Sequence, residues 1–406
     1  MDKTIEFKAD TGGITEPKGF CAAAAHSDIG DKRDSRLDIG IIYSETPCSA
    51  AGVFTKNAVK AAPVLDCQRI LDTGSDIHGV IVNSGNANAC TGKQGMVDSR
   101  EMLRYAESST GSSENSFLIC STGRIGDLLP MDRLKPGIEE AGEAARLGAN
   151  EGIEFASSIL TSDTRTKTAT ATFVVEGKTV TIGGAAKGAG MIQPDMATML
   201  AFLTTDIQAS SKSLKSALKS VINRTFNAIT VDGDMSTNDT VLLLANGRSG
   251  VELNGESESL FEQALFEVCD CLAEKIVADG ERITKVVEIL ISGAANDREA
   301  ENVSRAIGNS LLVNTSWYGS DPIWGRLMDE LGYAEAKIDQ HVIDISYDDT
   351  PALIGGDPVP ENKPLWKEIV SRSRFSIKIN LHQGDGQFRL RSTDLTEGYV
   401  DFNKSE

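Results

Sequence analysis

The sequence predicts a mixed α/β fold with substantial antiparallel pairing, in which helices cover the faces of sheets. Three observations support this prediction. Short apolar runs end in turns of small polar residues, alternating segments flank tight turns, and other segments repeat apolar residues at a spacing of four.

Two short apolar runs in the N-terminal half predict buried strands. Val80–Val82 leads into the polar turn Asn83–Asn88, and Phe117–Cys120 ends in Ser121–Gly123. Residues 168–183 alternate Thr with apolar side chains around a Glu-Gly pair, which predicts a hairpin.

Further elements follow toward the C-terminus. Met199–Leu203 is a further apolar run, Leu214–Val221 predicts a short helix, and residues 260–276 carry the apolar stripe of a long one. Residues 375–390 alternate on both sides of a Gly-Asp-Gly turn, so we predict a hairpin there. Residues 350–364 are rich in Pro and Gly, which predicts a surface loop.

The composition excludes several classes of function. The 406 residues carry a formal net charge of −19, which argues against binding to nucleic acids or anionic membranes, because both need clustered positive charge. No apolar run is long enough for a transmembrane helix, and the segment after Met1 does not resemble a signal peptide. We therefore expect a cytoplasmic protein. Its length of 406 residues is enough for two or three domains.

The seven cysteines and four histidines do not form the spacings of a metal site. Cys269 and Cys271 stand close together, but a zinc site needs a second such pair. We expect most of these thiols to be small buried residues, and we predict no metal site.

The most unusual segment is Lys187–Leu200. It contains a lysine, the glycine-flanked Gly188–Gly190, and a small step from Ala197 to Thr198 just before an apolar strand. From the residues alone, a tight connection between strands is the favoured interpretation, because the spacing of a phosphate-binding loop is missing.

This segment resembles the signature of the ornithine acetyltransferase family, also called bifunctional glutamate N-acetyltransferases. Six further segments resemble family motifs in the expected order and span nearly the whole chain: Asn83–Asn88, Ser121–Gly126, Thr161–Thr164, Val231–Thr240, Asp279–Glu281 and Asp394–Val400. The resemblance implies an α/β architecture with sheets sandwiched by helices, a larger N-terminal domain, a smaller C-terminal domain at about 285–406, and a site between them.

The resemblance also implies that the precursor cuts itself. Thr198 would attack the carbonyl of Ala197, leaving an α-chain of residues 1–197 and a β-chain of residues 198–406. A threonine hydroxyl needs a base to become a good nucleophile. After cleavage Thr198 carries its own base, an α-amine with an ordinary pKa of roughly 7.7–8.

Other site residues are carried over position by position. The Thr122 hydroxyl and the Gly123 N–H match the family's oxyanion donors, which stabilise the tetrahedral intermediates of acyl transfer. Without the resemblance, the favoured interpretation is that Thr122 and Gly123 simply form a turn after a strand. The matching substrate-binding residues are Thr161, Lys187, Thr198, Glu281 and Asn403. Lys187 could otherwise be an exposed loop lysine, and Glu281 a surface residue at a helix end.

The implied reaction is a ping-pong acyl transfer in arginine biosynthesis. N-acetylornithine acetylates Thr198, and glutamate then takes the acetyl group. No metal or organic cofactor is implied; the two chains stay associated, and αβ pairs could form homo-oligomers. Three alternatives stay open: a paralogue with another donor or acceptor, a threonine hydrolase that passes the acyl group to water, and a non-catalytic paralogue.

An acidic segment contains Asp232, Asp234 and Asp239. A calcium loop would need a downstream Glu and a different spacing. We interpret the segment as structural support beside the site, with metal binding as the alternative.

Several positions depart from the family pattern. Arg282 and Ile283 stand where the family usually has Gly-Ala, Ile323 replaces an Asn, and Arg124 a Val. Few residues follow Asn403, so the hydroxyl that the family has at its chain end finds no match. These departures leave the identity of the donor and the acceptor open, and we expect them to alter substrate preference.

Overall fold

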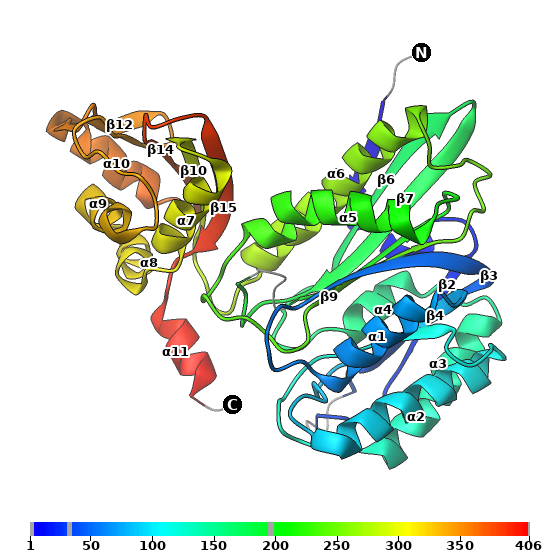
Figure 1. Ribbon diagram of the computed structural model, residues 1–406. Helices are drawn as coiled ribbons and strands as arrows, with labels where there is room; N and C mark the ends of the chain where they lie inside the picture. The colour runs from blue at the N-terminus through cyan, green and yellow to red at the C-terminus, as the bar shows by residue number, and fades with distance from the viewer. Residues whose placement is uncertain (1–3, 31–34, 194–198, 405–406) are drawn as a thin grey trace. The chain divides into compact units, whose positions relative to one another are not determined.

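The structure of the protein, a computed structural model, describes residues 4–30, 35–193 and 199–404 (Figure 1). The described residues divide into two compact units. The first unit consists of the described residues within Met1–Gly188, Asp195–Asn227 and Met235–Ile276. The second unit consists of those within Ala189–Pro194, Ala228–Asp234 and Val277–Glu406. The mixed α/β fold predicted from the sequence is confirmed.

The first unit contains a nine-stranded sheet in the order β1-β6-β7-β8-β9-β3-β4-β5, with β2 paired to β3. The strands are β1 (Glu6–Ala9), β2 (Phe20–Ala25), β3 (Ile39–Phe54), β4 (Ile77–Asn83), β5 (Phe117–Ser121), β6 (Lys167–Val175), β7 (Lys178–Lys187), β8 (Leu200–Thr205) and β9 (Thr240–Ala245). Its helical segments are η1 (Gly13–Thr15), α1 (Ala62–Thr73), α2 (Gly92–Thr110), α3 (Met131–Arg146), α4 (Gly152–Ser158), α5 (Ser211–Arg224), η2 (Phe226–Ala228) and α6 (Glu256–Ala278).

The long strand β3 joins two halves of this sheet. Its first part pairs with β2 and β4, and its second part pairs with β9. The register shifts between Tyr43 and Cys48, where Pro47 has no N–H for the ladder. The sheet therefore forms two layers instead of one flat surface.

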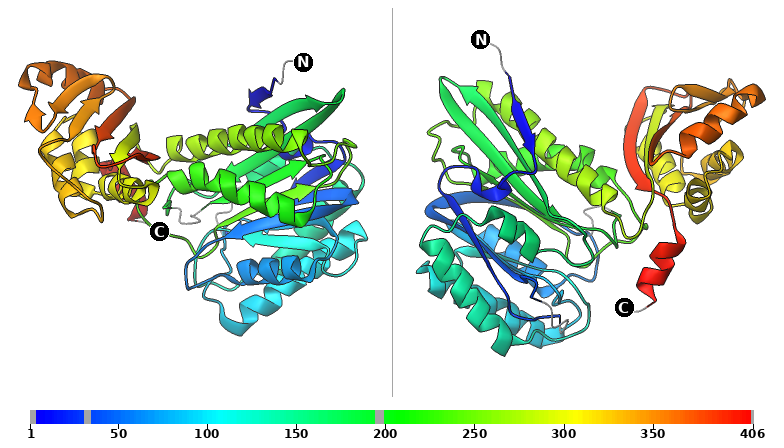
Figure 2. Two further views of the ribbon diagram at one scale, coloured as in Figure 1. Left: turned by 45° about the horizontal axis from the view of Figure 1, so that its top comes forward. Right: turned by 180° about the vertical axis from the view of Figure 1, so that it is seen from behind.

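Helices cover both outer faces of the two layers (Figures 1 and 2). Helices α5 and α6 lie over the layer that contains β6 to β9, where Val268 and Leu272 of α6 lie close to Gly184. Helices α1, α2 and α3 contact β2, β3 and β5 of the other layer.

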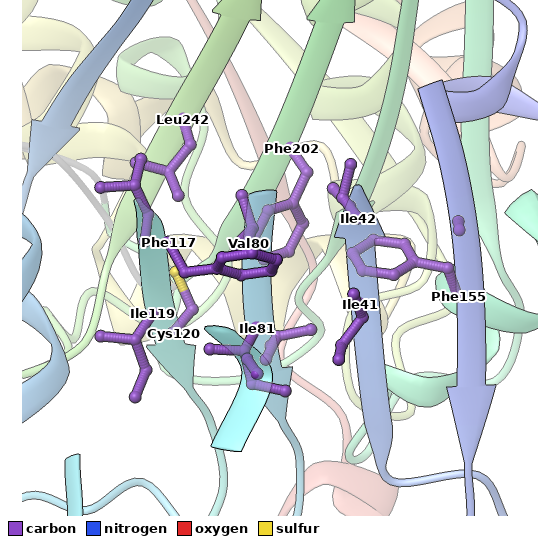
Figure 3. Packing of buried hydrophobic residues seen from close by; sticks show 14 of the residues in the cluster. Ile41, Ile42, Val80, Ile81, Phe117, Ile119, Cys120, Phe155, Phe202 and Leu242 are labelled. Carbon is purple, nitrogen blue, oxygen red and sulfur yellow. The ribbon is translucent and has the colours of Figure 1, made fainter. Parts of the chain in front are cut away.

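The main core of the first unit lies around the β3–β5 layer and includes residues of both layers. Phe202 and Leu242 of β8 and β9 belong to the same buried cluster as Val80 of β4 (Figure 3). Phe202 also meets Phe155 of α4 edge to face, with ring centroids 5.3 Å apart. These apolar contacts hold the ends of β5, β7 and β8, which carry the candidate site.

Most predicted elements of this unit are confirmed. The two apolar runs form β4 and β5, and the alternating segment forms the β6–β7 hairpin, whose turn residues Glu176 and Gly177 both have positive φ. The third apolar run forms β8, and the two predicted helices are α5 and α6.

The second unit has a six-stranded sheet in the order β13-β12-β11-β14-β10-β15. Its strands are β10 (Val286–Ala294), β11 (Asp344–Tyr347), β12 (Thr350–Ile354), β13 (Asp357–Pro358), β14 (Arg374–Asn380) and β15 (Gly386–Thr393), and its helices are α7 (Asp297–Gly308), α8 (Leu311–Tyr318), α9 (Trp324–Tyr333), η3 (Pro360–Asn362), α10 (Lys363–Val370) and α11 (Glu397–Asn403). Trp317 of α8 packs edge to face on Phe375 of β14.

The predicted hairpin at residues 375–390 was wrong. Both strands exist as β14 and β15, but they do not pair with each other. Strand β10 lies between them, parallel to β14 and antiparallel to β15. The alternating pattern marks each strand, but the apolar β10 competes for the ladder of both and takes the central place.

The surface loop predicted at residues 350–364 was also wrong. The segment contains β12, β13 and η3, and α10 begins at Lys363. Gly355 and Gly356, both at positive φ, form the turn between β12 and β13. Pro360 lies in the first turn of η3, where a missing N–H costs little.

Within the described residues, no helix combines the length and apolar character needed to cross a bilayer.

Candidate active site

Lys187 is the centre of the candidate site in the first unit. It is the last residue of β7 and pairs in register with Leu200, the first residue of β8. Its side chain is buried, and its ammonium donates to the Thr161 hydroxyl at 2.7 Å and to the Thr122 hydroxyl at 3.1 Å. The structure thus brings Thr122, Thr161 and Lys187 together beside the start of β8.

Thr122 and Gly123 follow directly after β5. The Thr122 N–H donates to the Asn83 carbonyl at 3.0 Å, and the Asn238 amide donates to the Ser121 carbonyl at 2.9 Å, so the turn is held from two sides. Because Lys187 donates to the Thr122 oxygen, the hydroxyl hydrogen of Thr122 is left to donate elsewhere. This is the arrangement that an oxyanion donor needs.

Gly123 is a position that only glycine fits. Its φ is +134°, and a Cβ there would lie 2.3 Å from the Gly85 carbonyl carbon and 2.4 Å from the Asn86 nitrogen. The residue is exposed, and its N–H has no hydrogen-bond acceptor within the described part of the chain. The N–H is therefore available to a ligand.

Asp163 provides the negative charge beneath Lys187. Its carboxylate accepts from Lys167 Nζ at 2.6 Å and from the Gly188 N–H at 2.6 Å, and it lies 3.9 Å from Lys187 Nζ. Burial alone would raise the pKa of this carboxyl, but the charges of Lys187 and Lys167 hold it at about 2. Asp163 is therefore ionised at neutral pH and stabilises both ammonium groups.

The predicted cleavage site, Ala197-Thr198, lies outside the described residues. The described chain resumes at Met199, whose N–H donates to the Asp239 carboxyl at 2.8 Å. Asp239 is buried just before β9, which runs parallel to β8. The backbone that follows Thr198 is thus fixed at the same end of the sheet as Thr122 and Lys187.

Glu281 and Asn403 belong to the second unit and contact each other there. The Asn403 amide donates to Glu281 Oε2 at 3.2 Å, and the Glu281 N–H donates to the Ala189 carbonyl. A Cβ on Gly190 would lie 2.3 Å from Glu281 Oε1, so this glycine of the signature makes room for the carboxylate. The glycine-flanked loop therefore has a packing role as well as a turn role.

Arg282 points to helix α11. Its guanidinium lies over the Phe402 ring, 5.3 Å from the centroid, and its carbonyl accepts from the N-cap hydroxyl of Thr396. These contacts hold the helix whose last residue, Asn403, meets Glu281. The neighbouring Ile283 packs at 3.0 Å from the Cβ position of Gly280.

Asp232 holds the signature loop of the second unit. It accepts from the N–H groups of Met191 at 2.6 Å, of Ile192 at 2.8 Å and of Asp234 at 3.2 Å. The Tyr399 hydroxyl of α11 donates to it at 3.4 Å. Burial, together with the charges of Asp232 and its acidic neighbours, raises the pKa of Tyr399 above its ordinary range. Asp232 thus has the structural role favoured from the sequence.

Sequence reasoning missed Asp163, Lys167 and Phe402, and it named Asp239 only as part of an acidic segment beside the site. Asp163 lies within the Thr161–Thr164 motif that resembles the family, two residues after Thr161, and its place in that motif was the available signal. The sequence shows no sign that Lys167 and Lys187 would meet one carboxylate, because that contact depends on the β6–β7 register.

Comparison with known proteins decides the family. The model of the ArgJ family matches residues 22–405 of this chain. The chain belongs to the ArgJ family. This match confirms the family expected from the motifs.

Relatives match the ArgJ-family chain over nearly its whole length. The arginine biosynthesis bifunctional protein ArgJ of Symbiobacterium thermophilum is 42% identical over 397 residues, which cover 97% of this chain and 98% of the relative. The protein of the same name from Thermotoga neapolitana is 42% identical over 395 residues, with 95% and 98% covered. A crystal structure of ArgJ from Bacillus halodurans is 38% identical, with a TM-score of 0.50; the match covers 52% of this chain and 100% of that one.

Proposed function

We propose that this ArgJ-family chain is a self-cleaving acetyltransferase that transfers an acetyl group from N-acetylornithine to glutamate, with Thr198 as the nucleophile. The observation that carries the proposal is the contact of Lys187 with Thr122 beside the start of β8. This contact holds the Thr122 hydroxyl, together with the available Gly123 N–H, near the start of β8, the strand that follows Thr198 in the chain.

The first half-reaction forms an acyl-enzyme. The Thr198 oxygen attacks the acetyl carbonyl of N-acetylornithine, and its proton passes to the α-amine that cleavage has freed. The Thr122 hydroxyl and the Gly123 N–H donate to the oxyanion of the tetrahedral intermediate. The carbon–nitrogen bond then breaks, ornithine leaves with the proton on its nitrogen, and the acetyl group stays on Thr198 as an ester.

The second half-reaction repeats these steps with glutamate. Its amine attacks the ester carbonyl, the same donors stabilise the oxyanion, and the Thr198 oxygen leaves and regains its proton. Thr161, Lys187, Glu281 and Asn403 bind polar groups of the substrates in this proposal. Lys187 supplies a compact cation for a carboxylate, and the Glu281 carboxylate suits a substrate ammonium.

The proposal includes an α-chain of residues 1–197 and a β-chain of residues 198–406. The B. halodurans ArgJ supports it, because about half of this chain matches the whole of that solved chain, as expected if a relative is cut near its middle. We further propose that the two chains remain associated, that αβ pairs form homo-oligomers, and that the enzyme acts in the cytoplasm.

Initial-rate kinetics test the reaction. Purified protein incubated with N-acetylornithine and glutamate should form ornithine and N-acetylglutamate, and double-reciprocal plots at several glutamate concentrations should be parallel. Intersecting lines would point to direct transfer without an acyl-enzyme. Release of free acetate without glutamate, at the rate of the full reaction, would favour a hydrolase instead.

A further inference from the structure

The Lys187 ammonium donates to two neutral hydroxyls although a carboxylate lies close to it. It donates to the Thr161 hydroxyl at 2.7 Å and to the Thr122 hydroxyl at 3.1 Å, whereas its nitrogen lies 3.9 Å from Asp163 Oδ2. A direct bond between an ammonium and a carboxylate, in which both partners are charged, is stronger than a bond to a hydroxyl, and burial strengthens it further. Some feature of the fold must therefore keep Lys187 from bonding directly to Asp163.

Lys167 supplies this feature. Its side chain is fully buried, and its ammonium donates to Asp163 Oδ1 at 2.6 Å and to the Arg165 carbonyl at 3.3 Å. The Gly188 N–H donates to the same Oδ1 at 2.6 Å, and the Thr161 N–H donates to Oδ2 at 3.1 Å. Because Lys167 balances the charge of the Asp163 carboxylate and these N–H groups hold it, the carboxylate attracts Lys187 less strongly than it would alone.

The β6–β7 hairpin makes the two lysines neighbours. Its register pairs Lys167 with Ala186, the residue before Lys187. The cluster therefore contains two ammonium groups and one carboxylate, Asp163, with a net charge of +1. A buried ion pair adds little stability compared with apolar side chains of the same size. The presence of Lys167 is thus better explained by its effect on Lys187 than by stability.

We propose that Lys167 is a positioning residue, which keeps the Lys187 ammonium on the Thr122 and Thr161 hydroxyls by occupying Asp163. Without Lys167, the Asp163 carboxylate would draw Lys187 into a direct ion pair and away from Thr122. The Thr122 hydroxyl would then lose the bond that directs its hydrogen. This role rests on the proposed acetyl transfer, in which Thr122 donates to the oxyanion.

A crystal structure of Lys167→Met tests the geometry without an activity assay. Met is unbranched like Lys and fills similar space, but it carries no charge. In this variant Lys187 Nζ should lie about 2.8 Å from an Asp163 oxygen and beyond hydrogen-bond reach of the Thr122 hydroxyl. A Lys187 that stays on both hydroxyls would overturn the proposal. Because this result does not depend on the reaction, a wild type that transfers no acetyl group would contradict the proposed function alone.

Steady-state kinetics test the consequence for the reaction, with kcat calculated per cleaved chain. Lys167→Met should lower kcat about 10- to 100-fold, less than removal of an oxyanion donor itself can cost. Adding Asp163→Asn removes the charge that draws Lys187 and returns the cluster to a net charge of +1. The double variant should therefore have a higher kcat than Lys167→Met. A merely structural role predicts a double variant no better than the single one. That outcome, or an unchanged kcat in Lys167→Met, would overturn the proposal.

Lys275→Met is the matched control. The Lys275 ammonium donates to Asp10 at 2.6 Å and to the Thr168 carbonyl at 2.8 Å, so this variant removes an ion pair of the same length from the same unit. Its kcat should equal that of the wild type, and a loss as large as that of Lys167→Met would overturn the proposal. Melting temperatures detect misfolding. If Lys167→Met does not fold, Lys167→Gln also removes the charge, keeps a donor, and should give the same shift of Lys187 and the same loss of kcat.

Discussion

At the scale of single residues, the direction of one hydroxyl determines what Thr122 can do. The Lys187 ammonium occupies a lone pair of the Thr122 oxygen, so its hydrogen points away from the lysine. Donation by a cation also polarises the hydroxyl and strengthens its own hydrogen bond. The lysine thus prepares a side-chain donor next to the backbone donor of Gly123.

Substitution of Thr122 tests this donor. Thr122→Ala should lower kcat by about 10²–10³ with little change in KM, since the lost bond forms in the transition state. Thr122→Ser keeps the hydroxyl and should retain most of the activity. Steady-state kinetics of the two variants make the comparison, and equal kcat values for Ala and Ser would remove Thr122 from the mechanism.

Asp163 leads to a prediction about pH and stability. Its folded pKa of about 2 lies below the ordinary value of 3.8, so its contribution is fully present above about pH 4 and is lost as the pH falls toward 2. The shift corresponds to roughly 2 kcal/mol at neutral pH. Asp163→Asn should therefore be less stable than the wild type at pH 6, with a difference that shrinks between pH 4 and pH 2. Urea unfolding across this range measures the difference, and a constant gap would contradict the ion-pair account.

At the scale of elements, sequence patterns predicted strands better than strand partners. Alternation and turn residues located β6, β7, β14 and β15, and β6 pairs with β7 as predicted because two residues separate them. The same logic failed for β14 and β15, since a strand from about 90 residues earlier in the chain, β10, lies between them. Pairing with a distant strand depends on the packing of the whole unit, which no local pattern reports.

Helix α11 carries a prediction of its own. Arg282→Ala removes the cation–π contact between the guanidinium and the Phe402 ring. A contact of this kind stabilises a folded protein by about 0.5–1 kcal/mol at exposed sites. Asn403 would then hold Glu281 less firmly. We expect the KM for one of the two substrates, N-acetylornithine or glutamate, to rise about 2- to 5-fold while kcat changes little. Steady-state kinetics with each substrate varied in turn measures both quantities.

Two further variants sharpen this test. Phe402→Leu should give the same change in KM. The KM of the double variant should be no higher than that of either single variant, because both substitutions remove the same contact. Arg224→Ala removes a similar pair with Phe266 in the first unit and should leave KM unchanged. Additive effects of Arg282→Ala and Phe402→Leu would mean that Arg282 acts elsewhere.

At the scale of the whole molecule, some residues that the family motifs singled out lie in contact within each of the two units, which no local pattern indicated. Lys187 contacts both Thr122 and Thr161, and Asn403 contacts Glu281. The Asp163 charge that holds Lys187 was not foreseen, because it depends on burial and on contacts set by strand register. A single sequence gives residue types in order, whereas burial and register follow from the folded chain.

In the proposed mechanism the acetyl group stays on Thr198 between the two half-reactions. The most direct measurement is mass spectrometry of the protein quenched after incubation with N-acetylornithine alone. We expect a β-chain whose N-terminal peptide begins at Thr198 and carries one acetyl group on its side chain, which glutamate then removes. A β-chain without the acetyl group, under conditions in which the full reaction proceeds, would rule out an acyl-enzyme on Thr198.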